Sequence, residues 1–213
     1  MTLNVDAAEG FPNDDELFGF ANWVNVCCGE HAGSPELTTT TLAECHRKGL
    51  KAGAHPGFPD RDGMGRRDPA DSETLNIWLL NAQKQVLAWA KEFEYVKPHG
   101  ALYNILTRPD HWAYEPCRDW VMEVQEATGL RFMLLAGTPL TIEIGAWREG
   151  FADRRYREDG TLVPRTEQGA VLHDLDEITA QVRRLEGVVD SVCVHGDGSD
   201  AAAICRHVAR ILR

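Results

Sequence analysis

The chain has 213 residues, 43% of them hydrophobic, so it can bury roughly 70% of the surface that its unfolded form exposes. We expect a single domain spanning residues 1–213. The formal net charge of -11, from 22 basic and 33 acidic side chains, opposes binding to nucleic acid. No basic leader segment and no apolar run long enough to span a membrane is evident, so we expect a cytoplasmic protein.

The cysteines are predicted to be reduced and mostly buried thiols. A chain of this length does not need disulfides to stabilise its core, and no pair has the Cys-x-x-Cys spacing of a zinc-thiolate site. The six residues concerned are Cys27, Cys28, Cys45, Cys117, Cys193 and Cys205.

The first part of the chain alternates β-prone runs with helical patterns. Residues 3–6 and 23–28 are predicted strands, and the second of these stops at a glycine. A helix follows, with Ser34 as N-cap, Pro35 in the first turn and Gly49 at its end. Residues 50–55 then form a third strand that ends in a histidine.

The same alternation continues to the C-terminus. A long helix over about residues 72–94 leads into residues 95–104, where an apolar approach meets Pro98 and then Gly100. Further helices are expected over about residues 112–129, around residues 178–185 and from Asp200 onward. Further strands are expected at residues 131–135, more weakly at 149–154, and before His195.

This alternation predicts an α/β fold of parallel βαβ units, with about seven strands. Four of the strands run into a histidine: His31, His55, His99 and His195. In a (β/α) barrel, side chains at the carboxyl ends of the strands meet at one face, which is where such barrels bind ligands. Because the histidines are spread over the whole chain, we expect a closed or nearly closed barrel, with seven strands suiting its short length.

The histidines are accompanied by the acidic residues Asp6, Glu9 and Asp197. Imidazoles beside carboxylates suit acid-base catalysis, but the same residue types bind divalent metals. The spacing is compatible with both functions, so it does not decide whether a metal is bound.

Candidate substrate-binding residues flank these positions. Lys97 and His99 lie two apart on an extended segment, so they are expected to point the same way and to reach one anionic ligand together. Arg66 lies in a glycine-containing loop and is a candidate for phosphate contacts. Asn25 and Asn104 are candidates for positioning an amide. No glycine-rich nucleotide-binding motif is present.

Taken together, these motifs resemble the LamB/YcsF family, the A component of prokaryotic 5-oxoprolinase. The resemblance lies in segments that follow one another along almost the whole chain. They comprise residues 4–11, residues 28–33, residues 53–56 with 65–67, residues 96–104, residues 151–154 with 159–165, residues 169–174 and residues 192–198.

The resemblance implies a β/α barrel of the glycoside hydrolase/deacetylase type and an ATP-dependent activity. That activity is the opening of the 5-oxoproline (pyroglutamate) lactam to L-glutamate, with Mg-ATP used through a complex with partner subunits B and C. It implies a general base at Asp6 or Glu9. His31, His55, His99 and His195 would move protons or bind the tetrahedral intermediate, while Lys97 and Arg66 would hold phosphate or carboxylate.

Two other functions remain open on sequence grounds. A metal-dependent amide or acyl hydrolase, similar to the deacetylases of this fold, would bind a divalent ion at Asp6 and the histidines and would need no ATP. A non-catalytic subunit would instead bind a metabolite for a partner enzyme.

Overall fold

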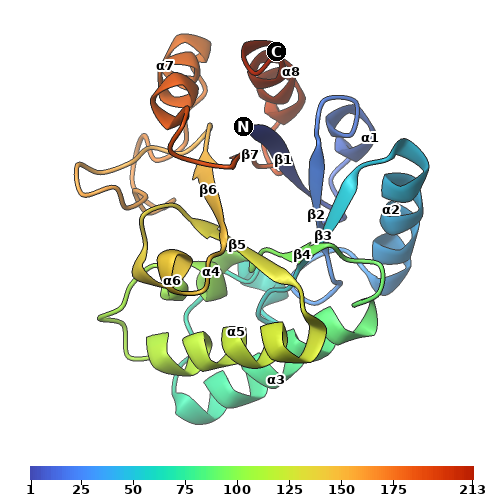
Figure 1. Ribbon diagram of the computed structural model, residues 1–213, viewed down its shortest axis with the longest axis vertical. Helices are drawn as coiled ribbons and strands as arrows, with labels where there is room; N and C mark the ends of the chain where they lie inside the picture. Colours follow the sequence, from blue (N-terminus) through green and yellow to red (C-terminus); the bar gives the residue numbers. More distant parts are fainter.

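The computed structural model describes residues 1–213 and forms a closed barrel of seven parallel strands (Figure 1). Each strand pairs with its neighbours in chain order, and β7 closes the ring on β1. The predicted seven-stranded barrel is therefore confirmed. The strands are β1 (Thr2–Ala7), β2 (Trp23–Cys27), β3 (Lys51–His55), β4 (Tyr95–Val96), β5 (Arg131–Leu135), β6 (Trp147–Phe151) and β7 (Ser191–Val194).

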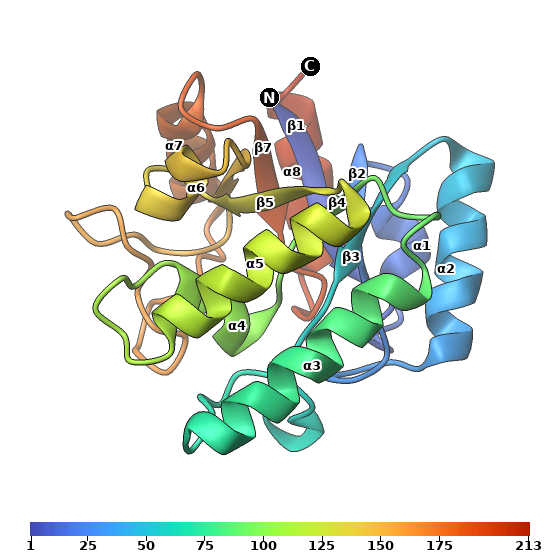
Figure 2. The same ribbon diagram turned by 60° about the horizontal axis from the view of Figure 1, so that its bottom comes forward.

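The helices surround the strands, and α3 packs alongside α5 across one side of the barrel (Figure 2). None of them is long and apolar enough to cross a membrane. The α-helices are α1 (Asp14–Leu17), α2 (Pro35–Lys48), α3 (Ser72–Ala88), α4 (Gly100–Leu106), α5 (Tyr114–Thr128), α6 (Pro139–Glu143), α7 (Leu175–Leu185) and α8 (Ala201–Ile211). The Ser34 side chain caps α2 by accepting from the Leu37 amide, and Gly49 ends that helix in a left-handed conformation, as predicted.

Alternate residues of each strand face opposite sides of the barrel wall. One set, including Val5, Val24, Val192 and Phe132, belongs to an apolar cluster of 54 buried residues, so the main core lies between strands and helices. The other set points into the barrel and is mixed: Asp6, Asn25 and Glu149 are buried and polar, whereas Trp23, Tyr95 and Met133 form a separate apolar cluster. The outer layer therefore forms the main apolar core, and the barrel interior holds a group of buried ionisable side chains.

Three predicted boundaries differ from the structure. The helix expected to reach residue 94 ends at Ala88, and the chain then makes turns until the Glu94 amide bonds the Ala52 carbonyl at the barrel wall. The strand expected over residues 149–154 begins at Trp147, because residues 147–149 pair with β5. Only two residues of the segment leading to Pro98 are in a strand, since a proline has no amide to donate.

All six cysteines are buried free thiols, as predicted. Burial raises the pKa of the thiols of Cys45, Cys117 and Cys205 to about 12, which suppresses the reactive thiolate. These cysteines act as small apolar side chains.

Candidate functional site

A group of polar side chains fills the interior of the barrel. The Lys97 ammonium lies 2.8 Å from Asp6 Oδ1 and 3.0 Å from Glu149 Oε1, so one cation links strands from opposite parts of the ring. The Asn25 amide donates to Asp6 Oδ1 at 2.8 Å, and the Tyr95 hydroxyl donates to Asn25 Oδ1 at 2.7 Å. We call this group the interior network; its members are Asn4, Asp6, Asn25, Tyr95, Lys97 and Glu149.

The charges of the interior network hold one another in place. Burial alone would raise the pKa of Asp6, but the Lys97 ammonium, together with His55 and His195, outweighs it and keeps that pKa well below the usual range. Burial likewise opposes the charge on Lys97, and the neighbouring Asp6 carboxylate raises the pKa of Lys97 well above its usual value. Burial raises the pKa of Glu149, whose Oε2 accepts from the Tyr103 hydroxyl at 2.8 Å. Asp6 is thus held as a carboxylate with little tendency to take a proton.

These placements change the expected roles of Lys97 and Asn25. The Lys97 side chain is 2% exposed and already paired with two carboxylates, so it has no open face for a substrate phosphate or carboxylate. Asn25 is fully buried and bonds only within the interior network. The structure therefore does not place either residue where the predicted contact with substrate requires it.

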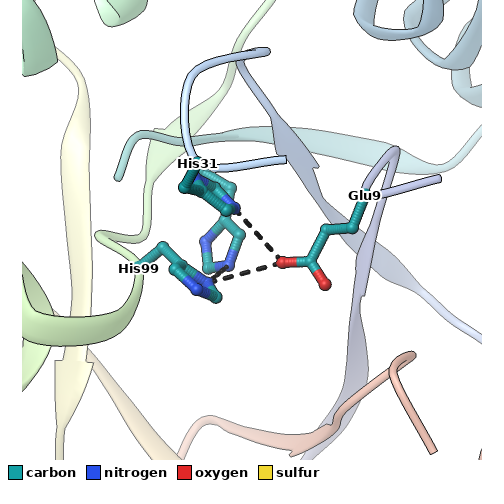
Figure 3. Close-up of side chains that lie close together, drawn as sticks. Glu9, His31 and His99 are labelled. Atoms are coloured by element: carbon teal, nitrogen blue, oxygen red, sulfur yellow. Dashed lines mark hydrogen bonds and ion pairs between the residues drawn. The ribbon is translucent and has the colours of Figure 1, made fainter. Parts of the chain in front are cut away.

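A second group lies at the carboxyl ends of β1 to β4 and consists of Glu9, His31, His55 and His99. We call it the imidazole cluster. Figure 3 shows one Glu9 carboxylate oxygen facing both His31 and His99. Glu9 Oε1 lies 3.2 Å from His31 Nε2 and 3.5 Å from His99 Nδ1, and His99 Nδ1 lies 2.9 Å from His55 Nε2. The rings of His31 and His99 are stacked, with centroids 3.9 Å apart.

The backbone orients the rings of the imidazole cluster. His55 Nδ1 donates to the Lys97 carbonyl at 2.7 Å, and His99 Nε2 donates to the Met64 carbonyl at 2.8 Å. Gly57 packs so closely on His31 that a Cβ there would lie 2.3 Å from its Nδ1. The rings of His55 and His99 are therefore held by hydrogen bonds before any ligand arrives, whereas His31 is positioned by packing.

The histidines of the imidazole cluster differ in their protonation. Burial lowers the pKa of His55 to about 4. Burial, together with the neighbouring His31, holds the pKa of His99 well below its usual value. Burial opposes the charge on His31, but its contacts with Cys27 and Glu9 outweigh burial and raise its pKa to about 9. His31 therefore takes up a proton more readily than His55 or His99. His55 Nε2 also lies 3.6 Å from a second carboxylate oxygen, Asp6 Oδ2.

The fourth predicted histidine belongs to a separate pair. His195 Nδ1 lies 3.0 Å from Asp153, which also accepts from the His195 amide at 2.9 Å. Because a carboxylate only accepts, Nδ1 carries the proton, which leaves Nε2 with a lone pair. That Nε2 lies 4.0 Å from Asp6 Oδ2, and the ring stacks on Phe151. This is the arrangement of a histidine base oriented by an acid.

Arginine side chains lie beside this pair. Arg66 and Arg165 donate to the same oxygen of Asp197, at 2.6 and 2.8 Å, and their side chains are 33% and 24% exposed. The two guanidiniums lower the pKa of Asp197 against the opposing effect of burial. Two cations therefore share one carboxylate and keep further N–H groups for an anion.

The structure brings together ten of the eleven predicted site residues within the interior network, the imidazole cluster, the Asp153–His195 pair and the group of Arg66, Arg165 and Asp197. Asn104 is the exception: it is exposed on α4, and its backbone carbonyl accepts from Thr107 and Arg108. Sequence reasoning overlooked Glu149, Asp153 and Arg165. The first two had a usable signal, since both continue the alternate positions of the weakly predicted strand that includes Phe151.

The whole chain, residues 1–213, matches the model of the LamB/YcsF family. The chain belongs to the LamB/YcsF family. Members similar to it include proteins named as the A component of 5-oxoprolinase. That of Histophilus somni is 37% identical over 100% of this chain and 95% of its own length, and that of Pyrococcus furiosus is 35% identical over 100% and 93%.

Solved structures agree with this family assignment. The lactam utilization protein from Thermus thermophilus superposes with a TM-score of 0.81 at 28% identity, covering 100% of this chain and 95% of that one. A family 4 carbohydrate esterase from Streptomyces lividans superposes with a TM-score of 0.50 at 11% identity, over 100% and 86% of the two chains. The second likeness concerns the fold alone and shows that the two chains share a similar barrel.

Proposed function

We propose that this chain is the A component of an ATP-dependent 5-oxoprolinase, which opens the lactam of 5-oxoproline to L-glutamate together with subunits B and C. The observation that carries the proposal is the full-length match, at 35–37% identity, to proteins named as that component. The geometry at the carboxyl ends of the strands suits the hydrolytic part of this reaction.

The need for ATP follows from the electronic structure of the lactam. Resonance makes an amide carbon a poor electrophile, and transfer of a phosphoryl group from Mg-ATP to the lactam oxygen removes that resonance. Water then adds to the ring carbon, the C–N bond breaks, and the ring nitrogen takes up a proton as the leaving amine. A second water cleaves the resulting acyl phosphate to glutamate and inorganic phosphate, so that one ATP is consumed for each ring opened.

We infer that His195 acts as the general base. Its Nε2 has a lone pair because Nδ1 donates to Asp153, and the side chain is 13% exposed. Asp153 and the nearby Asp6 carboxylate stabilise the imidazolium that forms when His195 takes a proton from water. Of the two carboxylates expected as base, Asp6 is the weaker candidate. It is paired with Lys97, and its pKa lies so far below the usual range that it takes up a proton poorly.

We infer that Arg66 and Arg165 hold the anionic part of the substrate. Their guanidiniums converge on Asp197 and are partly exposed, and each has more donors than that carboxylate uses. The carboxylate of 5-oxoproline or its newly attached phosphoryl group is the anion of matching chemistry.

The test is glutamate release from 5-oxoproline by the assembled three-component enzyme with Mg-ATP. We expect release to require ATP, this chain and both partner subunits. The substitution His195→Gln should lower turnover by about 10²–10⁴-fold, the usual contribution of a general base. The exposed His46 on α2 offers the control substitution His46→Gln, which should leave turnover unchanged.

Two outcomes would contradict the proposal. One is a complete mixture that hydrolyses ATP but releases no glutamate from 5-oxoproline. The other is amide hydrolysis by this chain on its own without ATP, which would favour the deacetylase-like hydrolase that the barrel type also allows.

A further inference from the structure

We propose that the imidazole cluster binds one divalent transition-metal ion of the zinc type, with Glu9, His31, His55 and His99 as its ligands. This site goes beyond lactam opening and does not depend on it. The four ligand atoms lie within 4.8 Å of one another, close to the span of a coordination sphere with metal–ligand distances of about 2.0–2.2 Å.

The first argument is that lone pairs face one another in this cluster. His55 and His99 each donate their ring N–H to a backbone carbonyl, so His55 Nε2 and His99 Nδ1 are both acceptors. These two nitrogens are nevertheless 2.9 Å apart, and the Glu9 carboxylate lies 3.5 Å from the second of them. Acceptors at such distances repel one another unless a cation lies between them.

The second argument is the surrounding backbone. Metal-binding histidines usually donate their other ring N–H to a carbonyl or carboxylate, which fixes the direction of the lone pair, and His55 and His99 both do so. The two non-glycine residues with positive φ in the chain, Ala8 and Met64, lie next to Glu9 and at the carbonyl that holds His99. Backbone strain of this kind gathers at functional sites.

The ligand set also selects the metal. Three imidazoles and one carboxylate suit zinc and its neighbours, whereas magnesium and calcium prefer oxygen ligands. Asp6, the carboxylate expected to ligate a metal, is engaged by Lys97 through Oδ1, so Glu9 takes that place. Such an ion would supply a Lewis acid at the mouth of the barrel.

The stacking of His31 on His99 ranks the ligands. An ion in the plane of the His99 ring lies out of the plane of the His31 ring, because the two stacked rings are parallel to within 3°. His31 must therefore tilt to bind well, and we expect its loss to matter less than that of His99.

The test is direct metal binding by the whole chain after removal of metals with a chelator. We expect one equivalent of Zn²⁺ to bind, and one equivalent of Co²⁺ to give the visible absorption of a four-coordinate site. Loss of a residue that only orients a metal ligand weakens metal binding by roughly 10–100-fold. His99→Ala removes a ligand itself, so we expect it to weaken Zn²⁺ binding by more than that. Glu9→Gln, which keeps the shape of the side chain, should weaken it by at least about tenfold, while the exposed control His46→Ala should bind like the wild type.

Either of two results would overturn the proposal. In the first, the folded wild type binds neither ion stoichiometrically, in which case a shared proton bridges His55 and His99. In the second, His99→Ala and Glu9→Gln bind as tightly as His46→Ala, and the metal lies elsewhere. Circular dichroism of each variant shows whether it is folded, and no readout depends on glutamate release, so failure of the metal site and failure of the oxoprolinase proposal are separate results.

Discussion

The interior network and the imidazole cluster are both buried groups of ionisable side chains, yet they differ in how their polar atoms are partnered. In the interior network the Lys97 cation is matched by Asp6 and Glu149, and the amide and hydroxyl groups donate to definite acceptors. In the imidazole cluster, acceptor faces acceptor across 2.9 Å. The interior network has a cation beside both of its carboxylates, with Glu149 Oε1 held by the Lys97 charge and not by a hydrogen bond. The imidazole cluster leaves lone pairs facing one another. Substitutions in the two groups should therefore have different effects on stability and on metal binding.

Loss of the central cation should have the largest effect. Lys97→Met leaves Asp6 and Glu149 buried without a partner, so we expect the free energy of unfolding to fall by about 3–5 kcal/mol. The control is Lys48→Met at the exposed pair with Glu44, which should cost no more than about 0.5 kcal/mol. Denaturant unfolding measures both, and equal losses would show that the interior network does not stabilise the barrel.

A substitution at the Tyr95 position of the interior network should lower stability by a smaller amount. Tyr95→Phe removes the hydroxyl that donates to Asn25 Oδ1 and leaves that buried oxygen without this partner. We expect a cost of about 1–3 kcal/mol in the free energy of unfolding. Zinc affinity should not change, and a variant that lost zinc binding while keeping its stability would reverse the roles assigned to the two groups.

In the imidazole cluster, a substitution that displaces a ring should lower zinc affinity more than it lowers stability. In Gly57→Ala the new Cβ would approach His31 Nδ1 to 2.3 Å, which forces this ring to move. We expect zinc affinity to fall roughly tenfold, as for other losses of ligand orientation. Calorimetric titration with Zn²⁺ measures this, and unchanged affinity would remove His31 from the ligand set.

The smallest effect concerns the Asp153–His195 pair and appears only in acid. Burial acts to raise the pKa of Asp153, but the contacts with His195, together with Arg165, outweigh it and hold the pKa below the ordinary value of 3.8. Because the folded pKa is depressed, the stabilisation is present above about pH 4 and is lost as pH falls through the folded value. Wild type should therefore lose more stability than Asp153→Asn between pH about 6 and about 3. Parallel losses in the two proteins would show that the pair does not contribute.

Much of the fold was predictable because its signals are local. Histidines that follow strands, helix caps such as Ser34 and Gly49, and the break at Pro98 indicated parallel strands whose ends meet at one face. The ends of β6 and α3 were harder to place. No glycine or proline marks the end of α3, and the pairing of Trp147 with β5 is a contact between distant parts of the chain.

The sequence predicted most residues of the candidate site, but not how far along the barrel axis each side chain lies. Lys97 and His99 do point to the same side of the wall, as their spacing implies. Two residues along a strand correspond to about 6.6–6.8 Å, however, which puts one side chain in the interior network and the other in the imidazole cluster. Periodicity tells which side of a strand a residue faces, but the level of each side chain depends on the stagger of the whole barrel.

The short strand β4 and the residues after it have a consequence for how this enzyme family can diverge. Residues 97–99 contribute the central ammonium through the Lys97 side chain, hold His55 through the Lys97 carbonyl, and supply His99 itself. Two residues separated only by Pro98 thus serve folding and chemistry at once, and few substitutions there can alter one without the other. Adaptation to a different ring substrate is therefore expected to spare this segment and to proceed through the loops that carry Arg66 and Arg165.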